Sequence, residues 1–398
     1  MSGFVGLRRG DIAWTVVVPA LCLAAIGMIF IHSATAESSP SLWMRQLLFV
    51  CAGVAAVLGL CLVGVHRLCG ASMEIYAVLV CILLLMPFFA EPTTVGSDRW
   101  IRLPLGFKLQ PSEFMKLGLV LALARHLRHR GVTKTWGSYL PPFLLMALPW
   151  VCVARQPDLG SSLVLLPVFV AMVSVSGARL RHVVMLGLGS VILVLLAYHT
   201  PGVLKPYQKE RLDSFRTSIP ARVSEAREMR LAREHDRARV IEQEISRLKR
   251  GTGFQQFYSV VAIGSGGLTG AGLGEGLQNR SNRLPVRHSD FIYAVIGEEW
   301  GLAGTVTVVL LYMALTAGIL GVAHRTREPY GRLVCVGVGS LIAGQAFMNL
   351  GIATGMLPVT GLPLPLVSYG GSSTLATSLG LGCVLDVARR RTSVFFEQ

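Results

Sequence analysis

The acidic residue Asp290 stands where both proton transfer and anion binding could take place. A cluster of cations precedes it, and a long apolar run follows it directly. A carboxylate at such a point could act as a general base, and the cations could hold an anionic lipid head group. The cations are Arg280, Arg283, Arg287 and His288.

A second polar group opens another apolar run. Pro111, Ser112 and Glu113 are typical of a helix start with the acid in its first turn. Glu113 and Lys116 are spaced i, i+3 on one helix face, so they can neutralise each other. This pair is either a structural ion pair or a substrate contact.

A third group, residues 155–161, contains Asp158, whereas Arg99 shortly precedes the second group. Pro157 and Asp158 open an apolar run, and Ser161 follows at the distance at which Asp158 can cap a helix. The cap and a substrate contact remain open as interpretations of Asp158. Arg99 stands beside Trp100, which suits either an interfacial anchor or a phosphate ligand.

Two further features concern glycine and acid placement. The glycine-rich stretch 262–276 resembles a phosphate-cradling loop, but no preceding strand or G-K-[ST] pattern supports a nucleotide site. On a continuous helix, Glu298 would lie about 80° around and about 12 Å along from Asp290, too far for a close carboxylate dyad. The sequence assigns no role to Glu298 or Glu299.

Proline and glycine are dense over residues 349–373, between two apolar runs, and Ser368 lies among them. This pattern predicts a broken helix or a re-entrant loop. Irregular backbone is tolerated at membrane depth only where protein or a wet cavity covers it.

The elements that must position these residues are membrane helices. Of the 398 residues, 52% are hydrophobic and 15% are charged. The apolar residues come in blocks of about 18–25, long enough to cross the hydrocarbon core. These numbers exclude a soluble enzyme, a secreted disulfide scaffold and a disordered chain. We predict an all-α, polytopic integral membrane protein with about ten transmembrane helices, at 12–32, 44–65, 72–91, 112–126, 138–154, 159–177, 182–200, 291–322, 332–354 and 366–387.

Charge placement predicts the sidedness of the helices. Lys and Arg concentrate in the short loops on one side, which places both termini in the cytoplasm. The net charge of +15 is therefore explained without nucleic acid. The eight cysteines lie in or beside apolar runs without C-x-x-C spacing, so we interpret them as small buried hydrophobic residues.

Three regions follow from this arrangement. Residues 1–200 hold helices one to seven, residues 201–289 form one large extracytoplasmic loop, and residues 290–398 hold helices eight to ten and a short cytoplasmic tail. Arg and Glu alternate over 221–250, which predicts a solvated or membrane-surface helix inserted in the loop, or a spacer without chemistry.

Taken together and in this order, these groups resemble the SEDS (shape, elongation, division and sporulation) family of bacterial membrane proteins. The resemblance covers almost the whole chain. Residues 204–212 and 361–365 are more similar to the elongation members than to the division members. The motifs that carry the resemblance are Arg99-Trp100, Gln110–Lys116, Gln156–Gly160, Ile263–Gly267, His288–Ile292, Gly297–Trp300 and Ser368–Ser373.

The resemblance implies a SEDS-type fold and a peptidoglycan glycosyltransferase that polymerises lipid II outside the bacterial cytoplasmic (inner) membrane. The acid that matches Asp290 is the proposed catalytic residue of the family. A class B penicillin-binding protein and other elongation-complex membrane proteins are the implied partners. The substrate-binding candidates are Arg99, Glu113, Lys116, Asp158, Arg287, His288 and Ser368.

The chemistry leaves the cofactor and two other functions open. A sugar hydroxyl needs a base, and a pyrophosphate leaving group needs positive charge, which side chains or a divalent cation (Mg²⁺ or Mn²⁺) would supply. The alternatives are a lipid II flippase and a non-catalytic scaffold. Asp290 near the outer surface favours the enzyme, because a flippase should need polar groups through the midplane, where the predicted spans carry almost no charge.

Overall fold

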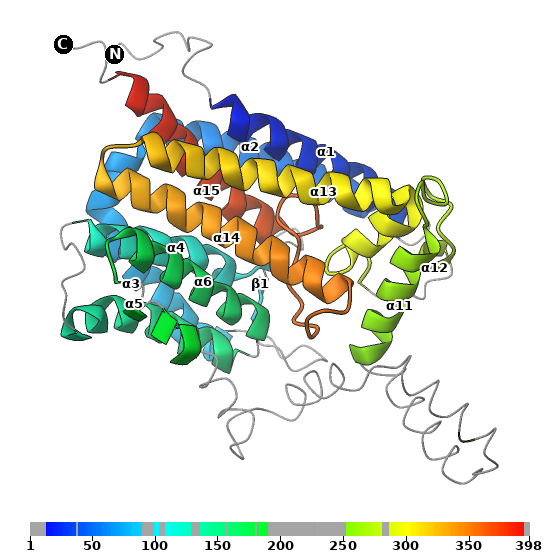
Figure 1. Ribbon diagram of the computed structural model, residues 1–398, viewed down its shortest axis with the longest axis horizontal. Coiled ribbons are helices and arrows are strands. Elements are labelled where there is room, and N and C mark those ends of the chain that lie inside the picture. Colours follow the sequence, from blue (N-terminus) through cyan, green and yellow to red (C-terminus); the bar gives the residue numbers. More distant parts are fainter. Residues whose placement is uncertain are drawn as a thin grey trace.

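In the computed structural model, the apolar runs form long helices that pack side by side in one bundle (Figure 1). Apart from the helices, the described residues contain a two-residue antiparallel pair, β1 (Ile101–Arg102) with β2 (Lys108–Leu109). The structure describes residues 13–36, 39–89, 99–102, 108–128, 136–156, 158–179, 181–182, 184–185, 187–189, 229, 252–280 and 286–393.

The helices confirm the predicted all-α fold. Those of the first half are α1 (Trp14–Thr35), α2 (Ser41–Val63), α3 (Val65–Phe89), α4 (Pro111–Leu127), α5 (Leu140–Arg155) and α6 (Leu159–Val175), with a short 3-10 turn η2 (Trp136–Tyr139) before α5. Those of the second half are α11 (Thr252–Ser265), α12 (Leu277–Arg280), α13 (Ile292–Arg325), α14 (Pro329–Ala353) and α15 (Gly371–Ser393).

Nine of the ten predicted spans correspond to helices in the described part of the chain. The seventh, 182–200, lies mostly outside the described residues, as does the charged stretch 221–250. The predicted start of the last span at 366 is wrong, because α15 begins at Gly371 and the preceding residues are irregular. Within the predicted loop 201–289, the helix α11 packs against α13 and α14.

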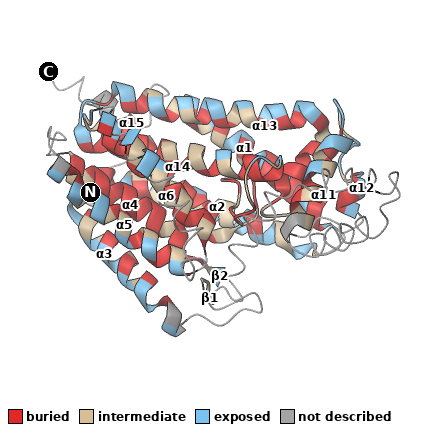
Figure 2. Ribbon diagram, turned by 60° about the horizontal axis from the view of Figure 1, so that its bottom comes forward, coloured by how far each residue is buried: buried red, intermediate tan, exposed pale blue. Residues whose placement is uncertain are grey.

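Membrane placement follows from helix length and surface. Among the described residues, six helical stretches are long and apolar enough to span a bilayer. Figure 2 shows buried residues gathered inside the bundle and exposed residues on its outer helix faces. Large apolar side chains such as Leu62 and Phe88 are exposed there, which suits contact with lipid. The six stretches are Trp14–Thr35, Ser41–Val63, Val65–Met86, Gly137–Arg155, Ile292–Arg325 and Pro329–Ala353.

The helix α4 is different because it lies in the interior of the bundle. It is 17 residues long, 14 of them are buried, and it contacts α3, α5, α6, α14 and α15. Its neighbours shield it from lipid, so it can carry the polar residues Glu113 and Lys116.

The two halves meet along several pairs of helices, because α14 contacts α4 and α6, α15 contacts α2, and α13 contacts α1. The start of α1 and the end of α15 lie at the same end of the bundle (Figure 1). This agrees with termini on one side of the membrane, while the cytoplasmic location of that side stays a prediction.

The cysteine prediction is correct in part. All eight cysteines are free thiols, and Cys69, Cys152, Cys335 and Cys383 are buried. Three others are exposed on the outer faces of their helices, because a membrane-facing surface accepts a small apolar side chain as readily as a core does. They are Cys22, Cys51 and Cys81.

Candidate functional site

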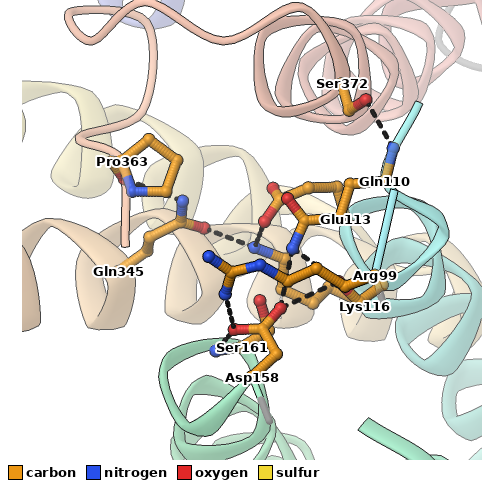
Figure 3. A network of polar contacts seen from close by, with 10 residues as sticks. Arg99, Gln110, Glu113, Lys116, Asp158, Ser161, Gln345, Pro363 and Ser372 are labelled. Atoms are coloured by element: carbon orange, nitrogen blue, oxygen red, sulfur yellow. Dashed lines mark hydrogen bonds and ion pairs between the residues drawn. The ribbon is translucent and has the colours of Figure 1, made fainter. Parts of the chain in front are cut away.

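A buried network of polar side chains lies where α4 and α6 begin (Figure 3). Asp158 Oδ1 accepts a hydrogen bond from the backbone N–H of Ser161 at 3.2 Å, so the predicted helix cap is confirmed. Asp158 Oδ2 accepts bonds from Gln110 at 2.7 Å and Ser112 at 3.1 Å. The Arg99 guanidinium lies 3.5 Å from Oδ1, with its side chain 21% exposed. Asp158 therefore joins α4, α6 and the chain before β1.

The predicted ion pair on α4 is also confirmed. Lys116 Nζ lies 2.7 Å from Glu113 Oε1, and both side chains are buried. The same Nζ donates to Gln345 Oε1 on α14 at 3.0 Å, and Gln345 Nε2 donates to the carbonyl of Pro363 at 2.9 Å. Because both charges are buried, removal of one would leave the other without its counter-ion. The substrate-contact interpretation of this pair stays a prediction.

The predicted irregular segment connects α14 to α15 over residues 354–370, and most of its residues between 359 and 368 are buried. Its polar backbone groups are paired within protein. The Leu364 N–H donates to Ser368 Oγ at 2.8 Å, and the Ser368 N–H donates to the Leu364 carbonyl at 2.9 Å. Asn349 Nδ2 donates to the Leu362 carbonyl at 2.6 Å. Protein thus covers this irregular backbone, as its predicted depth requires.

Asp290 lies in a turn, residues 286–290, that precedes α13. The N–H groups of Ser289 and Asp290 donate to the carbonyl of Val286 at 3.1 and 3.2 Å. Asp290 is partly exposed, and its Oδ1 accepts the hydroxyl of Ser289 at 2.7 Å. A Cβ at Gly361 would lie 3.5 Å from Asp290 Oδ2, so the irregular segment passes beside the carboxylate.

Two of the candidate residues join this turn to the irregular segment. The Ser368 hydroxyl donates to the Ser289 carbonyl, and the Tyr369 N–H donates to the His288 carbonyl at 2.9 Å. The rings of His288 and Tyr369 meet edge to face, with centroids 5.6 Å apart. Ser368 and His288 therefore lie beside Asp290 and fix the backbone that carries it.

Burial lowers the pKa of the His288 imidazole below its ordinary value. The Asp290 carboxylate acts in the opposite direction and raises the pKa, and the Arg287 guanidinium lowers it. The net effect favours the neutral ring near pH 7. A positive charge on His288 for an anionic head group stays a prediction.

Arg287 points toward another part of the molecule. It is buried, and its guanidinium donates to the carbonyls of Ala34, at 2.7 Å, and Asn279. It lines a cavity of about 230 Å³ with Arg280 and His32. The structure thus brings Arg99, Glu113, Lys116 and Asp158 close together and joins Ser368 and His288 to Asp290, whereas Arg287 ties the end of α1 to α12.

The glycine-rich stretch supplies hydrogen-bond acceptors at the point where α13 is interrupted. Gly301 has φ 63° and ψ −156°, which interrupts the helix. The N–H of Leu302 donates to the Gly267 carbonyl at 2.9 Å, and that of Ala303 donates to the Leu268 carbonyl at 3.2 Å. These backbone groups serve helix packing, so the phosphate-loop interpretation is not supported.

Glu298 and Glu299 bind α12, which follows the glycine-rich stretch, and the end of α1. Glu298 accepts the backbone N–H groups of Gln278 at 2.7 Å and Asn279 at 3.2 Å. Glu299 accepts the Ser33 hydroxyl and the Asn279 side-chain amide, each at 2.7 Å. Since Asp290 precedes α13, the assumption of one continuous helix from Asp290 to Glu298 is wrong.

The divalent cation stays a prediction. No three His, Cys, Asp or Glu side chains come together as a metal site in the described part of the chain. Mg²⁺ is often bound by one or two carboxylates together with substrate phosphates, and Asp290 could supply one such carboxylate.

Sequence reasoning missed two amides that organise the site, Gln345 on α14 and Gln46 on α2. Gln46 Nε2 donates to Thr374 Oγ1 at 3.1 Å, and its Oε1 accepts the Gly370 N–H at 3.2 Å. Both glutamines are buried. The signal was available: each is an isolated amide inside an apolar span, where an unpaired polar group is costly.

Comparison with known proteins agrees with this arrangement. A family model described as cell cycle protein, FTSW_RODA_SPOVE, matches residues 13–393. A protein of Geobacter metallireducens named probable peptidoglycan glycosyltransferase FtsW is 32% identical over 394 residues, 96% of each chain. Stage V sporulation protein E of Bacillus subtilis is 32% identical over 388 residues, 94% of this chain and 96% of that protein.

Solved structures share the fold as well. One chain comes from a structure described as "Structural coordination of polymerization and crosslinking by a peptidoglycan synthase complex". It is 30% identical, with a TM-score of 0.74 over 97% of this chain and 98% of that chain. The rod shape determining protein RodA of Thermus thermophilus is 29% identical, with a TM-score of 0.66 over 95% of this chain and 97% of that chain.

Proposed function

This chain belongs to the FtsW, RodA and SpoVE family of cell cycle proteins, and on that premise we propose that it polymerises lipid II with Asp290 as its general base. It is a peptidoglycan glycosyltransferase and a multi-pass protein of the inner membrane. The family matches the SEDS resemblance predicted from the sequence.

The proposed reaction needs one base and positive charge. The Asp290 carboxylate takes the proton of a sugar hydroxyl while the hydroxyl oxygen attacks the anomeric carbon of the lipid-linked donor. The bond from that carbon to the pyrophosphate breaks, and the pyrophosphate leaves with the electron pair. The protonated carboxyl group then gives its proton to water, which restores the base.

The placement of Asp290 is the observation that carries the proposal. Its side chain is partly exposed, in a turn that Ser368 and Tyr369 attach to the irregular segment. A general base must reach substrate and yet be held still, and this turn meets both requirements.

The substrate-binding roles also belong to this proposal. Arg99 is the candidate cation for the pyrophosphate, because its side chain is partly exposed although it contacts Asp158. Glu113, Lys116 and Asp158 support the wall of the site. Ser368 and His288 hold the turn, and Arg287, which lies in the turn, binds the carbonyls of Ala34 and Asn279.

The test is reconstitution with labelled lipid II and a class B penicillin-binding partner that lacks its own polymerising capacity. Wild type should make long glycan strands, and Asp290→Ala and Asp290→Asn should lower the rate by about 10²–10⁴-fold. A matched control is Glu275→Gln, which changes an exposed carboxylate that pairs with Arg280. Its rate should stay near that of wild type.

Other outcomes would move the assignment. Full activity of monodisperse Asp290→Asn would show that Asp290 is not the general base. No strands from wild type in an intact complex would favour the flippase or the scaffold. Transport of labelled lipid II in vesicles would then separate those two.

The cellular role is a finer part of the proposal. Residues 361–365 resemble the elongation members, and RodA is among the structural matches, whereas the relatives named above are FtsW and stage V sporulation protein E. We assign the chain to cell elongation with a class B penicillin-binding protein and other elongation-complex proteins. Depletion should then round the cells, whereas filaments would indicate division.

A further inference from the structure

Two amide side chains on α14 fasten the irregular segment to the rest of the site. Gln345 and Asn349 are one helical turn apart, so they lie on the same face of α14, and both are buried. Gln345 donates to the carbonyl of Pro363 at 2.9 Å, and Asn349 donates to that of Leu362 at 2.6 Å. Two consecutive carbonyls of the segment are thus bound by one helix face.

Asn349 makes a second bond that Gln345 does not make. Its Nδ2 also donates to the backbone carbonyl of Asp290 at 2.9 Å. An amide nitrogen carries two hydrogens, so it can serve both carbonyls at once. The Asp290 turn and the irregular segment are therefore held at a set distance from each other by a single side chain.

The other end of the same side chain argues against a purely stabilising role. Asn349 Oδ1 is buried and has no hydrogen-bond partner among the residues that the structure describes. A buried acceptor without a partner is unfavourable, so stability by itself does not favour an amide here. What the amide provides is a donor aimed at the carbonyl of Asp290.

We propose that Asn349 is the positioning residue of Asp290. It fixes the Asp290 backbone against Leu362, and so sets where the carboxylate meets the acceptor hydroxyl beside Gly361. Asn349 donates to the main-chain carbonyls of Asp290 and Leu362, not to the Asp290 carboxylate, so it acts through Asp290. This inference rests on the proposed function, because it takes Asp290 as the base.

The chain offers a matched control in Gln256 on α11. Its Nε2 donates to the carbonyls of Ile352, at 3.2 Å, and Leu357, at 2.6 Å. Gln256 is thus also a buried amide that bridges two carbonyls, one at the end of α14 and one in the irregular segment. Neither of these two bonds reaches the Asp290 turn.

The experiment compares Asn349→Ala, Asn349→Asp and Gln256→Ala in the reconstituted complex. Misplacement of a reacting group by about 1 Å can cost about 100-fold in rate, so kcat of Asn349→Ala should fall about 10- to 100-fold with KM within about 3-fold. Asn349→Asp keeps the shape but loses both donors when ionised, so it should show a similar loss. Gln256→Ala should keep kcat within about 3-fold of wild type, at a comparable loss of thermal stability.

Each outcome decides a separate point. Equal losses of kcat in Asn349→Ala and Gln256→Ala would reduce Asn349 to a structural bond and overturn the inference. Wild-type kcat in Asn349→Asp would show that shape suffices, which also overturns it. If Asn349→Ala does not fold, Asn349→Asp against Gln256→Ala makes the same comparison. Absence of strands from wild type would instead be a failure of the proposed function.

Discussion

Two acidic regions of this chain lie close in sequence but differ in their surroundings. Glu298 and Glu299 are almost fully buried, and backbone N–H groups, a hydroxyl and an amide donate to their oxygens. Asp290 is partly exposed in a turn beside Gly361, which has no side chain. The comparison teaches that donors and exposure, not the acidic residue type, separate a carboxylate that serves the fold from one that substrate could reach.

The physical reason is what surrounds each carboxylate. Fixed donors occupy the oxygens of Glu298 and Glu299, so these side chains hold α12 and the end of α1 against α13. The Asp290 side chain is partly exposed while hydrogen bonds hold its backbone, so substrate could reach it without disturbing the fold. Removal of an acceptor in the Glu298–Glu299 region is therefore expected to lower stability.

The largest expected effect on stability is that of Gly270→Ala. Gly270 has φ +82°, and a Cβ there would overlap the backbone of Glu299. Left-handed backbone costs about 1–2 kcal/mol in a residue with a side chain, and overpacking adds about 1–3 kcal/mol. Unfolding of detergent-solubilised protein, followed by fluorescence, should show this loss.

The control for that prediction is Gly267→Ala. Gly267 has φ +57°, but a Cβ there would meet nothing within 4 Å. Its loss should therefore be limited to the backbone cost. Equal losses for the two variants would contradict the close insertion of this loop against α13.

Glu299→Ala should have the next largest effect. It leaves the Ser33 hydroxyl and the Asn279 amide without their acceptor, and an unpaired buried donor costs about 1–3 kcal/mol. The exposed pair of Glu275 with Arg280 supplies the control, because Glu275→Ala should cost about 0–1 kcal/mol. Thermal melts of both variants measure the difference. Wild-type stability in Glu299→Ala would contradict the structural role of the Glu298–Glu299 region.

The smallest effect concerns pH and the neighbour of Asp290. Burial lowers the pKa of His288, so the folded protein binds fewer protons there than the unfolded chain. The stability from this residue is present above the unfolded pKa near 6.5 and falls as the pH drops below it. His288→Gln should make the melting temperature less sensitive to acid between about pH 7.5 and 5.5.

His324→Gln, at the exposed end of α13, is the control histidine. It removes a histidine outside the Asp290 turn, so the effect of His288→Gln is judged against it. A melting temperature that rises on acidification in wild type, and not in His288→Gln, would show the opposite sign for His288. That result would indicate that His288 carries a positive charge in the folded protein.

Local patterns predicted several elements of the site correctly. The Asp158 cap and the Glu113–Lys116 pair each join residues three positions apart, and such spacings are set by helix geometry. The irregular segment before α15 followed from its proline and glycine content. The helix α11 was not predicted as a separate element, because the count of spans placed the whole of 201–289 in one loop.

The sequence by itself determined the membrane fold, the starts of α4 and α6 and the acid before α13, because these depend on composition and short spacings. Only the tertiary structure decided which polar groups meet. Asn349 is 59 positions from Asp290, and Lys116 is 229 positions from Gln345. Contacts over such separations arise when helices pack, since a buried polar group must find its partner wherever packing places one.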